Sequence, residues 1–189
     1  MNAQNDHPSI NKFVHPPVLA LGFIVLGVLL GKLIPILPSL AGTPIRLAGL
    51  PIVLAGPSSD TAYVRQQVLP RLGPRATWVG HLDHRELTRL VGEARVAVVT
   101  PCWDEPYGLV VAEALASGTP VAAFARGAIP EIVTAACASL AEPGDVDGLA
   151  DAIRRAAGLD RADARSHAEQ TCSSTRMTDE YERMYAEAS

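Results

Sequence analysis

From residue 51 to the end of the chain, short apolar runs alternate with longer segments that carry apolar residues at helical spacing. Each run predicts a buried strand of a parallel sheet: Pro51–Ala55, Thr77–Gly80, Val96–Thr100, Val121–Phe124 and Ala138–Leu140. Helical patterns cover residues 61–72, 84–94, 129–136, 145–157 and 178–188, and Asp83 precedes one of them as an N-cap. Strands that alternate with helices predict an α/β fold, a Rossmann-like parallel sheet with helices on both faces.

The first fifty residues follow a different pattern. A polar tail, residues 1–16, precedes an apolar segment, residues 17–45, in which Lys32 is the only charge between Pro17 and Pro44. A parallel strand needs only about five or six residues, whereas a run of about 20 apolar residues matches a transmembrane helix. We therefore expect a membrane helix within residues 17–40, with Lys32 reaching the interface. A first strand of the sheet is the alternative interpretation.

Composition narrows the function classes. The net charge of −4 gives no basic face for nucleic acid, so we expect no nucleic-acid partner. The three cysteines, Cys102, Cys137 and Cys172, are widely spaced and form no C-x-x-C pair. They indicate reduced thiols in a reducing compartment, and neither a disulfide set nor a metal set.

The run from Glu105 to Val121 carries the candidate chemistry. Its two glutamates, Glu105 and Glu113, are separated by eight positions, the first in a turn and the second inside a short apolar helix. The turn Tyr107–Leu109 offers backbone N–H groups at the start of that helix, where a phosphate is stabilised by free donors and by the helix dipole. Gly108 allows the backbone to approach such a ligand closely. Glu105 can then accept hydrogen bonds from hydroxyls beside the phosphate, and Glu113 can reach a ribose diol.

This run resembles the donor-binding signature of retaining GT-B glycosyltransferases, the group 1 or family 4 enzymes that use nucleotide sugars. Four further pieces match the family pattern in order and spacing: Leu54–Pro57, Val79–Leu82, Arg126–Val133 and Pro143–Asp145. The resemblance covers nearly all of residues 51–189. It implies the nucleotide-sugar-binding, C-terminal half of a GT-B fold.

The resemblance also implies residue roles. Glu105 is the catalytic candidate and touches the donor sugar, Gly108, Leu109 and Val110 hold the diphosphate through their backbone, and Glu113 holds the ribose. Donor binding belongs at the carboxyl ends of the strands, which adds Gly56 and Tyr107 to the candidate substrate-binding residues. Arg126 either approaches a phosphate or faces solvent. The family needs no bound metal or cofactor, because the nucleotide sugar is the substrate and the leaving diphosphate is stabilised electrostatically.

A GT-B enzyme has two Rossmann-like domains, and this chain is long enough for one. We therefore expect a donor-binding half that is incomplete without an acceptor-domain partner. The segment Val14–Val18 matches the family's linker, and Gly31–Leu33 fits the start of its basic phosphate loop. Ile36–Pro38 stands where the lysine and glycine of that loop are expected, so the loop is defective.

Residues 1–50 also resemble, over a short and mostly apolar stretch, the first membrane span of isoprenylcysteine-methyltransferase-like proteins. The chain would then be a fusion joined near residues 46–49. Three function classes stay open: a sugar-transfer domain that needs a partner, an inactive nucleotide-sugar-binding fragment, and a protein anchored by its N-terminal helix. In each case we expect a cytoplasmic location, with any anchored form on the cytoplasmic face, because nucleotide sugars are made there.

Overall fold

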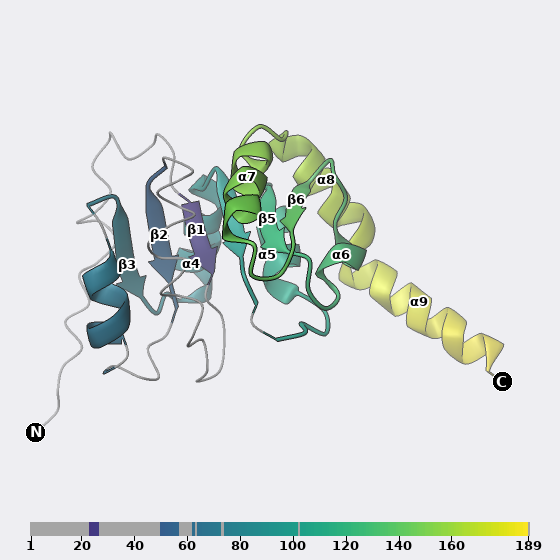
Figure 1. Cartoon of the computed structure of the whole chain (residues 1–189). Helices are drawn as coiled ribbons and strands as arrows, with labels where there is room; N and C mark the ends of the chain where they lie inside the picture. Colours follow the sequence, from purple (N-terminus) through teal and green to yellow (C-terminus); the bar gives the residue numbers. More distant parts are fainter. Residues whose placement is uncertain are drawn as a thin grey trace, which may run out of the picture.

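The computed structural model describes residues 23–26, 50–56, 62, 64–72, 74–101 and 103–188. Within this part, one sheet contains six parallel strands in the order β3-β2-β1-β4-β5-β6 (Figure 1). Their bounds are β1 Phe23–Leu26, β2 Ile52–Ala55, β3 Ala76–Gly80, β4 Val96–Val99, β5 Val121–Phe124 and β6 Ala138–Ala141. The five strands expected after residue 50 are confirmed. β1 and β4 are neighbours in the middle of the sheet, with β2 and β3 on one side and β5 and β6 on the other. In open α/β sheets, ligands bind at the carboxyl ends of the strands where the strand order changes direction in this way.

The prediction of a membrane helix within residues 17–40 is wrong for Phe23–Leu26. These residues form β1, which lies in the middle of the sheet and pairs with β2 through Phe23 and Ile52 and with β4 through Val25 and Val98. A central strand of a parallel sheet is apolar on both faces, so its sequence has no polar alternation to distinguish it from a membrane span. No helix among the described residues is long and apolar enough to cross a membrane. The rest of residues 17–45 lies outside the described residues.

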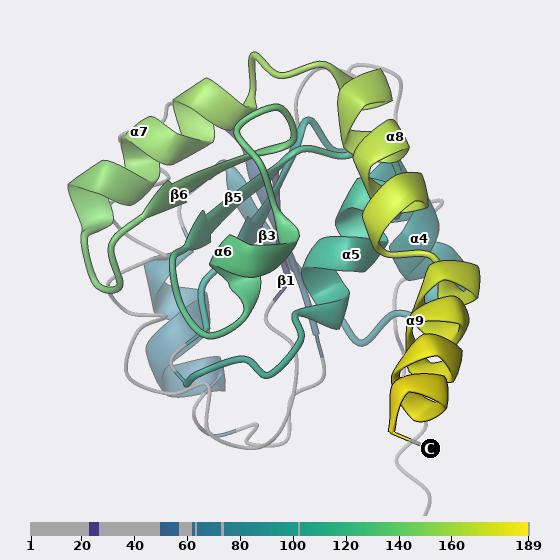
Figure 2. The ribbon, with the colours of Figure 1, turned by 90° about the vertical axis from the view of Figure 1, so that its right-hand side faces the viewer.

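Helices cover both faces of the sheet (Figure 2). On one face lie α4 (His84–Glu93), α5 (Leu109–Ala116) and α8 (Arg161–Thr171), and α7 (Val146–Ala156) packs on the other. Side chains of β4 alternate between the two cores: Ala97 and Val99 face α4 and α5, whereas Val96 and Val98 face α7. The expected two-sided α/β architecture is therefore confirmed.

Several helices differ from the sequence pattern. The segment expected as a helix over residues 61–72 contains a π-helical turn, Val64–Val68, and a 3₁₀ turn, Leu69–Arg71. α6 (Ile129–Ile132) ends at Ile132 instead of Ala136, because Val133 is extended and a tight turn at Thr134 leads into β6. α9 (Ser174–Glu187) begins before the expected Thr178. The sequence pattern gave no helix at α8.

The helix starts that carry acidic caps are confirmed. The Asp83 carboxylate accepts a hydrogen bond from the backbone N–H of Glu86 at 2.8 Å, and the Glu86 carboxylate accepts one from the N–H of Asp83 at 3.0 Å. Asp145 caps α7 in the same way by accepting from the N–H of Gly148 at 2.9 Å. Each cap satisfies donors that the first turn of a helix leaves without partners.

Asp83→Ala is expected to lower the free energy of unfolding by about 1 kcal/mol, because it removes one half of the capping box of α4. Urea unfolding followed by circular dichroism measures this change. Asp179→Ala, which removes an exposed carboxylate inside α9, serves as the control. Equal midpoints for the two variants would contradict a stabilising role for the cap.

Arg161, at the start of α8, joins the carboxyl ends of α4 and α5. Its guanidinium donates to the carbonyl oxygens of Ala94 and Gly92, both at 2.6 Å, and to that of Ser117 at 3.4 Å. It also donates to the hydroxyl of the fully buried Thr119 at 3.2 Å. A cation at the carboxyl end of a helix is favoured by the helix dipole, and here one cation serves two helices. The relative position of α4 and α5 is fixed from this end.

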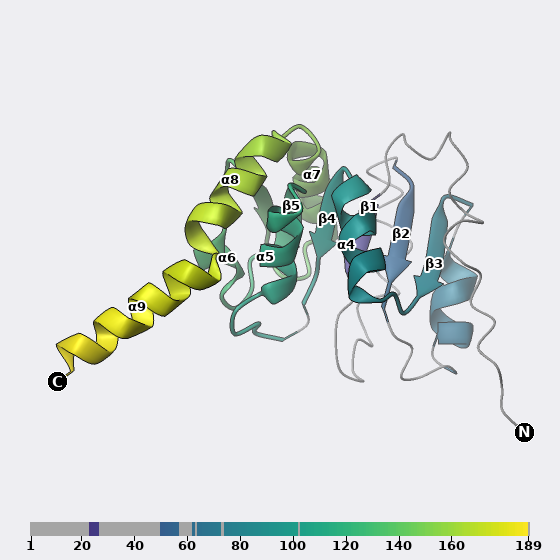
Figure 3. The same cartoon turned by 180° about the vertical axis from the view of Figure 1, so that it is seen from behind.

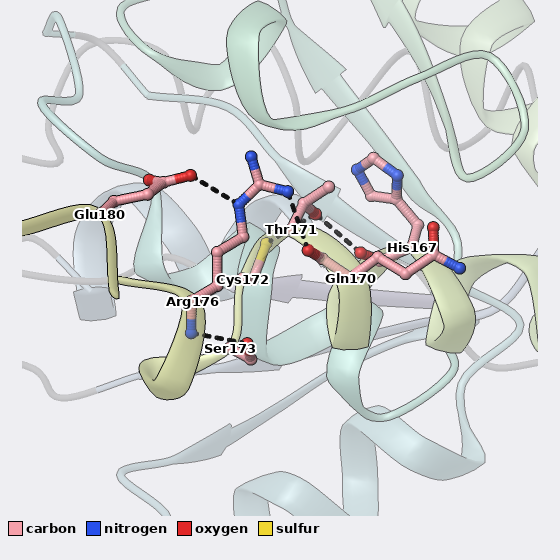
Figure 4. Close-up of polar contacts among 7 residues, drawn as sticks. All are labelled: His167, Gln170, Thr171, Cys172, Ser173, Arg176 and Glu180. Atoms are coloured by element: carbon pink, nitrogen blue, oxygen red, sulfur yellow. Dashed lines mark hydrogen bonds and ion pairs between the residues drawn. The ribbon is translucent and has the colours of Figure 1, made fainter. Parts of the chain in front are cut away.

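α9 projects away from the rest of the domain (Figures 1 and 3) and buries none of its residues. Polar contacts hold its junction with α8 (Figure 4). Arg176 donates to the carbonyl oxygen of Gln170 in α8 at 3.1 Å and to the carboxylate of Glu180 at 2.8 Å, and the Ser173 hydroxyl accepts from the N–H of Arg176 at 3.2 Å. These contacts set the direction in which α9 leaves α8.

Candidate functional site

The turn between β4 and α5 lies at the carboxyl end of β4, and β1 is the neighbouring strand. Gly108 is the N-cap of α5 and has φ 81° and ψ 44°, a left-handed conformation that favours glycine. The N–H groups of Val111 and Ala112 donate to the Gly108 carbonyl at 2.9 and 3.2 Å. The N–H groups of Leu109 and Val110 precede the first intrahelical bonds, so the start of α5 presents donors at the carboxyl edge of the sheet.

Glu105 is half-buried in the same turn, and the β5–α6 loop holds it from the other side. The Glu105 carbonyl accepts a hydrogen bond from the N–H of Ala128 at 2.8 Å. A Cβ atom at Gly127 would lie 2.3 Å from the Glu105 nitrogen and 2.4 Å from its carbonyl oxygen. Two loops separated in the sequence therefore interlock, and only glycine fits at this contact.

Glu113 is the only charged residue of α5, and it is exposed, whereas Val111, Ala112, Ala114 and Leu115 are buried. Glu113 lines a hollow between α4 and α5. The other residues that line this hollow are His84, Leu87, Thr88, Val91, Val110, Ala114 and Ser117. The hollow encloses about 250 Å³, part of it open to solvent. Because this volume includes open solvent, the hollow is a shallow surface depression and does not enclose a ligand.

The candidate substrate-binding residues fall into three places. Gly108, Leu109 and Val110 form one turn with Glu105, and the exposed Tyr107 lies in the same turn. Glu113 lies further along α5, toward the hollow. Gly56 is at the carboxyl end of β2, where its N–H donates to the Gly80 carbonyl at 2.8 Å, and β1 separates it from the β4–α5 turn.

Two residues at the site were not singled out from the sequence. Trp103, in the β4–α5 loop, exposes half of its side chain. A tryptophan in a polar loop beside the motif was the available signal. Gly127 was part of a matching piece but had no role of its own, because its contact with Glu105 spans a large sequence separation.

The histidines near the site, His81 and His84, are both exposed. Among the described residues, no group of three or more His, Cys, Asp or Glu side chains could hold a metal ion. Cys137 is buried and donates to the Thr134 carbonyl at 3.4 Å, so it is a packed thiol. Cys102 lies outside the described residues.

Curated relatives match part of the chain. It is 38% identical over 108 residues to the glycogen synthase of Mycobacterium tuberculosis, a match that covers 56% of this chain and 26% of that enzyme. It is 38% identical over 126 residues to the D-inositol 3-phosphate glycosyltransferase of Mycolicibacterium paratuberculosis, covering 63% of this chain and 28% of the relative. The matched region is thus less than a third of each relative.

Solved structures match nearly the whole chain. HepE of Anabaena in complex with UDP superposes with a TM-score of 0.70 at 20% identity, covering 94% of this chain and 52% of that one. The sucrose-phosphate synthase of Thermosynechococcus elongatus gives a TM-score of 0.68 at 26% identity, covering 95% and 48%. The chain spans about half the length of these proteins, and its α/β fold is that of one half of a GT-B structure.

The family model described as glycosyl transferases group 1 matches residues 33–158. This range includes β2 through α7 and every site residue described above. The chain therefore belongs to the group 1 glycosyltransferase family.

Proposed function

We propose that the domain formed by residues 51–189, with β1, binds a nucleotide sugar and is the donor half of a retaining glycosyltransferase. The observation that carries the proposal is the start of α5 at the carboxyl end of β4, next to β1, with Glu105 and Glu113 on either side of its first turn. One neighbour, HepE of Anabaena, is described in complex with UDP-glucose. That description supports a nucleotide sugar as the ligand class. The location proposed for the protein is the cytoplasm, where nucleotide sugars are made.

The proposed roles follow from the positions of the groups. The N–H groups from Gly108 to Val110 donate to the diphosphate, whose growing negative charge in sugar transfer is stabilised by the helix start. Glu105 accepts hydrogen bonds from donor-sugar hydroxyls, and Glu113 accepts them from the ribose. Tyr107 and Gly56 lie at the same edge of the sheet and border the donor. The proposal needs no metal ion or organic cofactor, because the nucleotide sugar is itself the substrate.

The acceptor is proposed to bind to a second domain that faces the carboxyl edge of this sheet, in a partner chain or elsewhere in a longer polypeptide. The second candidate function is nucleotide-sugar binding without transfer. Its support is the sequence Ile36–Pro38, which stands where the family's basic loop has a lysine and a glycine. The two candidates share the donor site and differ in sugar transfer.

Titration calorimetry of the full chain with UDP, GDP and ADP tests the donor site. We expect saturable binding of one of these nucleotides and an affinity about ten-fold lower in Glu113→Gln, because a charge-assisted hydrogen bond to a ribose hydroxyl contributes about 1.5–3 kcal/mol when fully formed and less at an exposed site. Glu182→Gln, in α9, removes the same charge at a position away from the site. This variant should bind nucleotide like the unaltered chain. A folded chain that binds none of the three nucleotides would contradict the proposal.

A further inference from the structure

Arg126 lies at the carboxyl end of β5, beside the proposed donor site. Its Nε is 3.5 Å from an Asp104 carboxylate oxygen, and the Asp104 side chain is 87% exposed, compared with 32% for Arg126. The separation exceeds that of a normal hydrogen bond, and a surface pair of this kind contributes little to stability. The guanidinium is thus the more enclosed partner in a loose ion pair.

The backbone around Arg126 is fixed. Its N–H donates to the Phe124 carbonyl at 2.8 Å, and its carbonyl accepts from the N–H of Ile129 at 3.3 Å. The next two residues, Gly127 and Ala128, make the contacts to Glu105 described above. Arg126 therefore belongs to the same interlocked pair of loops as Glu105 and the start of α5, and it cannot move away from them without breaking these contacts.

Arg126 is the cation that these two loops share with the carboxylates of Asp104 and Glu105. A diphosphate would add negative charge beside those carboxylates, so its binding there would depend on the guanidinium as a counter-charge. Arginine is suited to this position, because its planar guanidinium binds phosphate oxygens through two parallel hydrogen bonds. Asp104 is exposed enough to turn into solvent when a stronger anion competes for the same guanidinium.

From this geometry we propose that Arg126 is a phosphate-binding residue that exchanges Asp104 for the diphosphate when the donor binds. The proposal rests on the proposed function and adds a side-chain cation to the backbone donors of α5. Asp104 is then a competitor that weakens donor binding and keeps the guanidinium oriented in the free protein. Removal of the cation and removal of the competitor should have opposite effects on affinity for a diphosphate.

The test compares UDP, GDP and ADP with their nucleosides in titrations of the full chain. Arg126→Met should lower the affinity for the nucleoside diphosphate at least ten-fold and leave the affinity for its nucleoside unchanged. Asp104→Asn should raise the diphosphate affinity several-fold. The dependence of diphosphate affinity on salt concentration should be weaker in Arg126→Met than in the unaltered chain, because one phosphate contact is lost.

Arg89→Met is the matched control, since Arg89 pairs with Glu93 on the exposed side of α4 and should not alter binding. Diphosphate affinity unchanged in Arg126→Met would overturn the assignment of Arg126 and leave the proposed function standing. Equal losses for diphosphate and nucleoside, or an unfolding midpoint below that of Arg89→Met, would show a structural role and also overturn it. Absence of nucleotide binding by the unaltered chain would overturn both proposals.

Discussion

Gly127→Ala is expected to abolish nucleotide binding and to lower the free energy of unfolding by about 3 kcal/mol. The added methyl group would lie 2.3 Å from the Glu105 nitrogen, so the two loops must separate, and overpacking of this kind costs about 1–3 kcal/mol. The φ of +57° adds about 1–2 kcal/mol for any residue with a side chain. Separation of the loops moves Glu105 and Arg126 together, which is why binding should be lost as well as stability.

Gly144→Ala separates the two causes. Gly144 has φ +88°, but a Cβ atom there would meet nothing within 4 Å. This variant should therefore lose only the conformational part, about 1 kcal/mol, and should bind nucleotide normally. Urea unfolding and nucleotide titration of both variants measure the difference. Similar stability losses in the two variants would contradict the steric contact between Gly127 and Glu105.

The second large effect is expected at Arg161. Arg161→Leu should lower the free energy of unfolding by about 2 kcal/mol, because the carbonyl oxygen of Ala94 at the end of α4 and the buried hydroxyl of Thr119 lose the guanidinium as a donor. The expected loss of stability is no larger because part of the guanidinium is exposed, and water can replace it there. Urea unfolding followed by fluorescence of Trp78, which packs in the core around α7, measures the loss.

Two variants define what Arg161 contributes. Arg89→Leu removes an exposed cation of α4 that pairs with Glu93 one turn away, and such pairs contribute only about 0.3–0.5 kcal/mol. Arg161→Lys keeps the charge but cannot reach two helices with a planar fork, so its stability should fall between those of Arg161→Leu and the unaltered chain. Full stability of Arg161→Leu would mean that water replaces the guanidinium at no cost.

The features that the sequence predicted are those set by neighbouring residues. β4 and β5 are uninterrupted apolar runs. Asp83 caps α4, and Asp145 caps α7. The turn at Gly108 and the position of Glu113 on α5 follow from the same local rules. These are the parts of the fold and of the candidate site in which the physical cause lies within a few positions of its effect.

The features that the sequence did not predict depend on distant contacts. β1 is four residues of a long apolar segment, and pairing with β2 and β4, rather than the segment's length, selects them. α8 is mostly polar and buries only the small Ala164 and Ala168, so it has little of the apolar periodicity that indicates a helix. Its attachment relies on arginine contacts across large sequence separations, such as that from Arg161 to Gly92. The contact of Gly127 with Glu105 is of the same kind.

The position of α8 has a practical consequence for engineering. The family model ends at residue 158, and α8 begins at Arg161, so the stretch that defines the family by sequence stops short of the helix that joins α4 to α5. A chimera or shortened chain cut at that limit would lose Arg161 and uncover the core that Ala164 and Ala168 close. Domain exchange between relatives should therefore place its boundary beyond Thr171. The unit that folds together includes α8, although the sequence signature of the family ends before it.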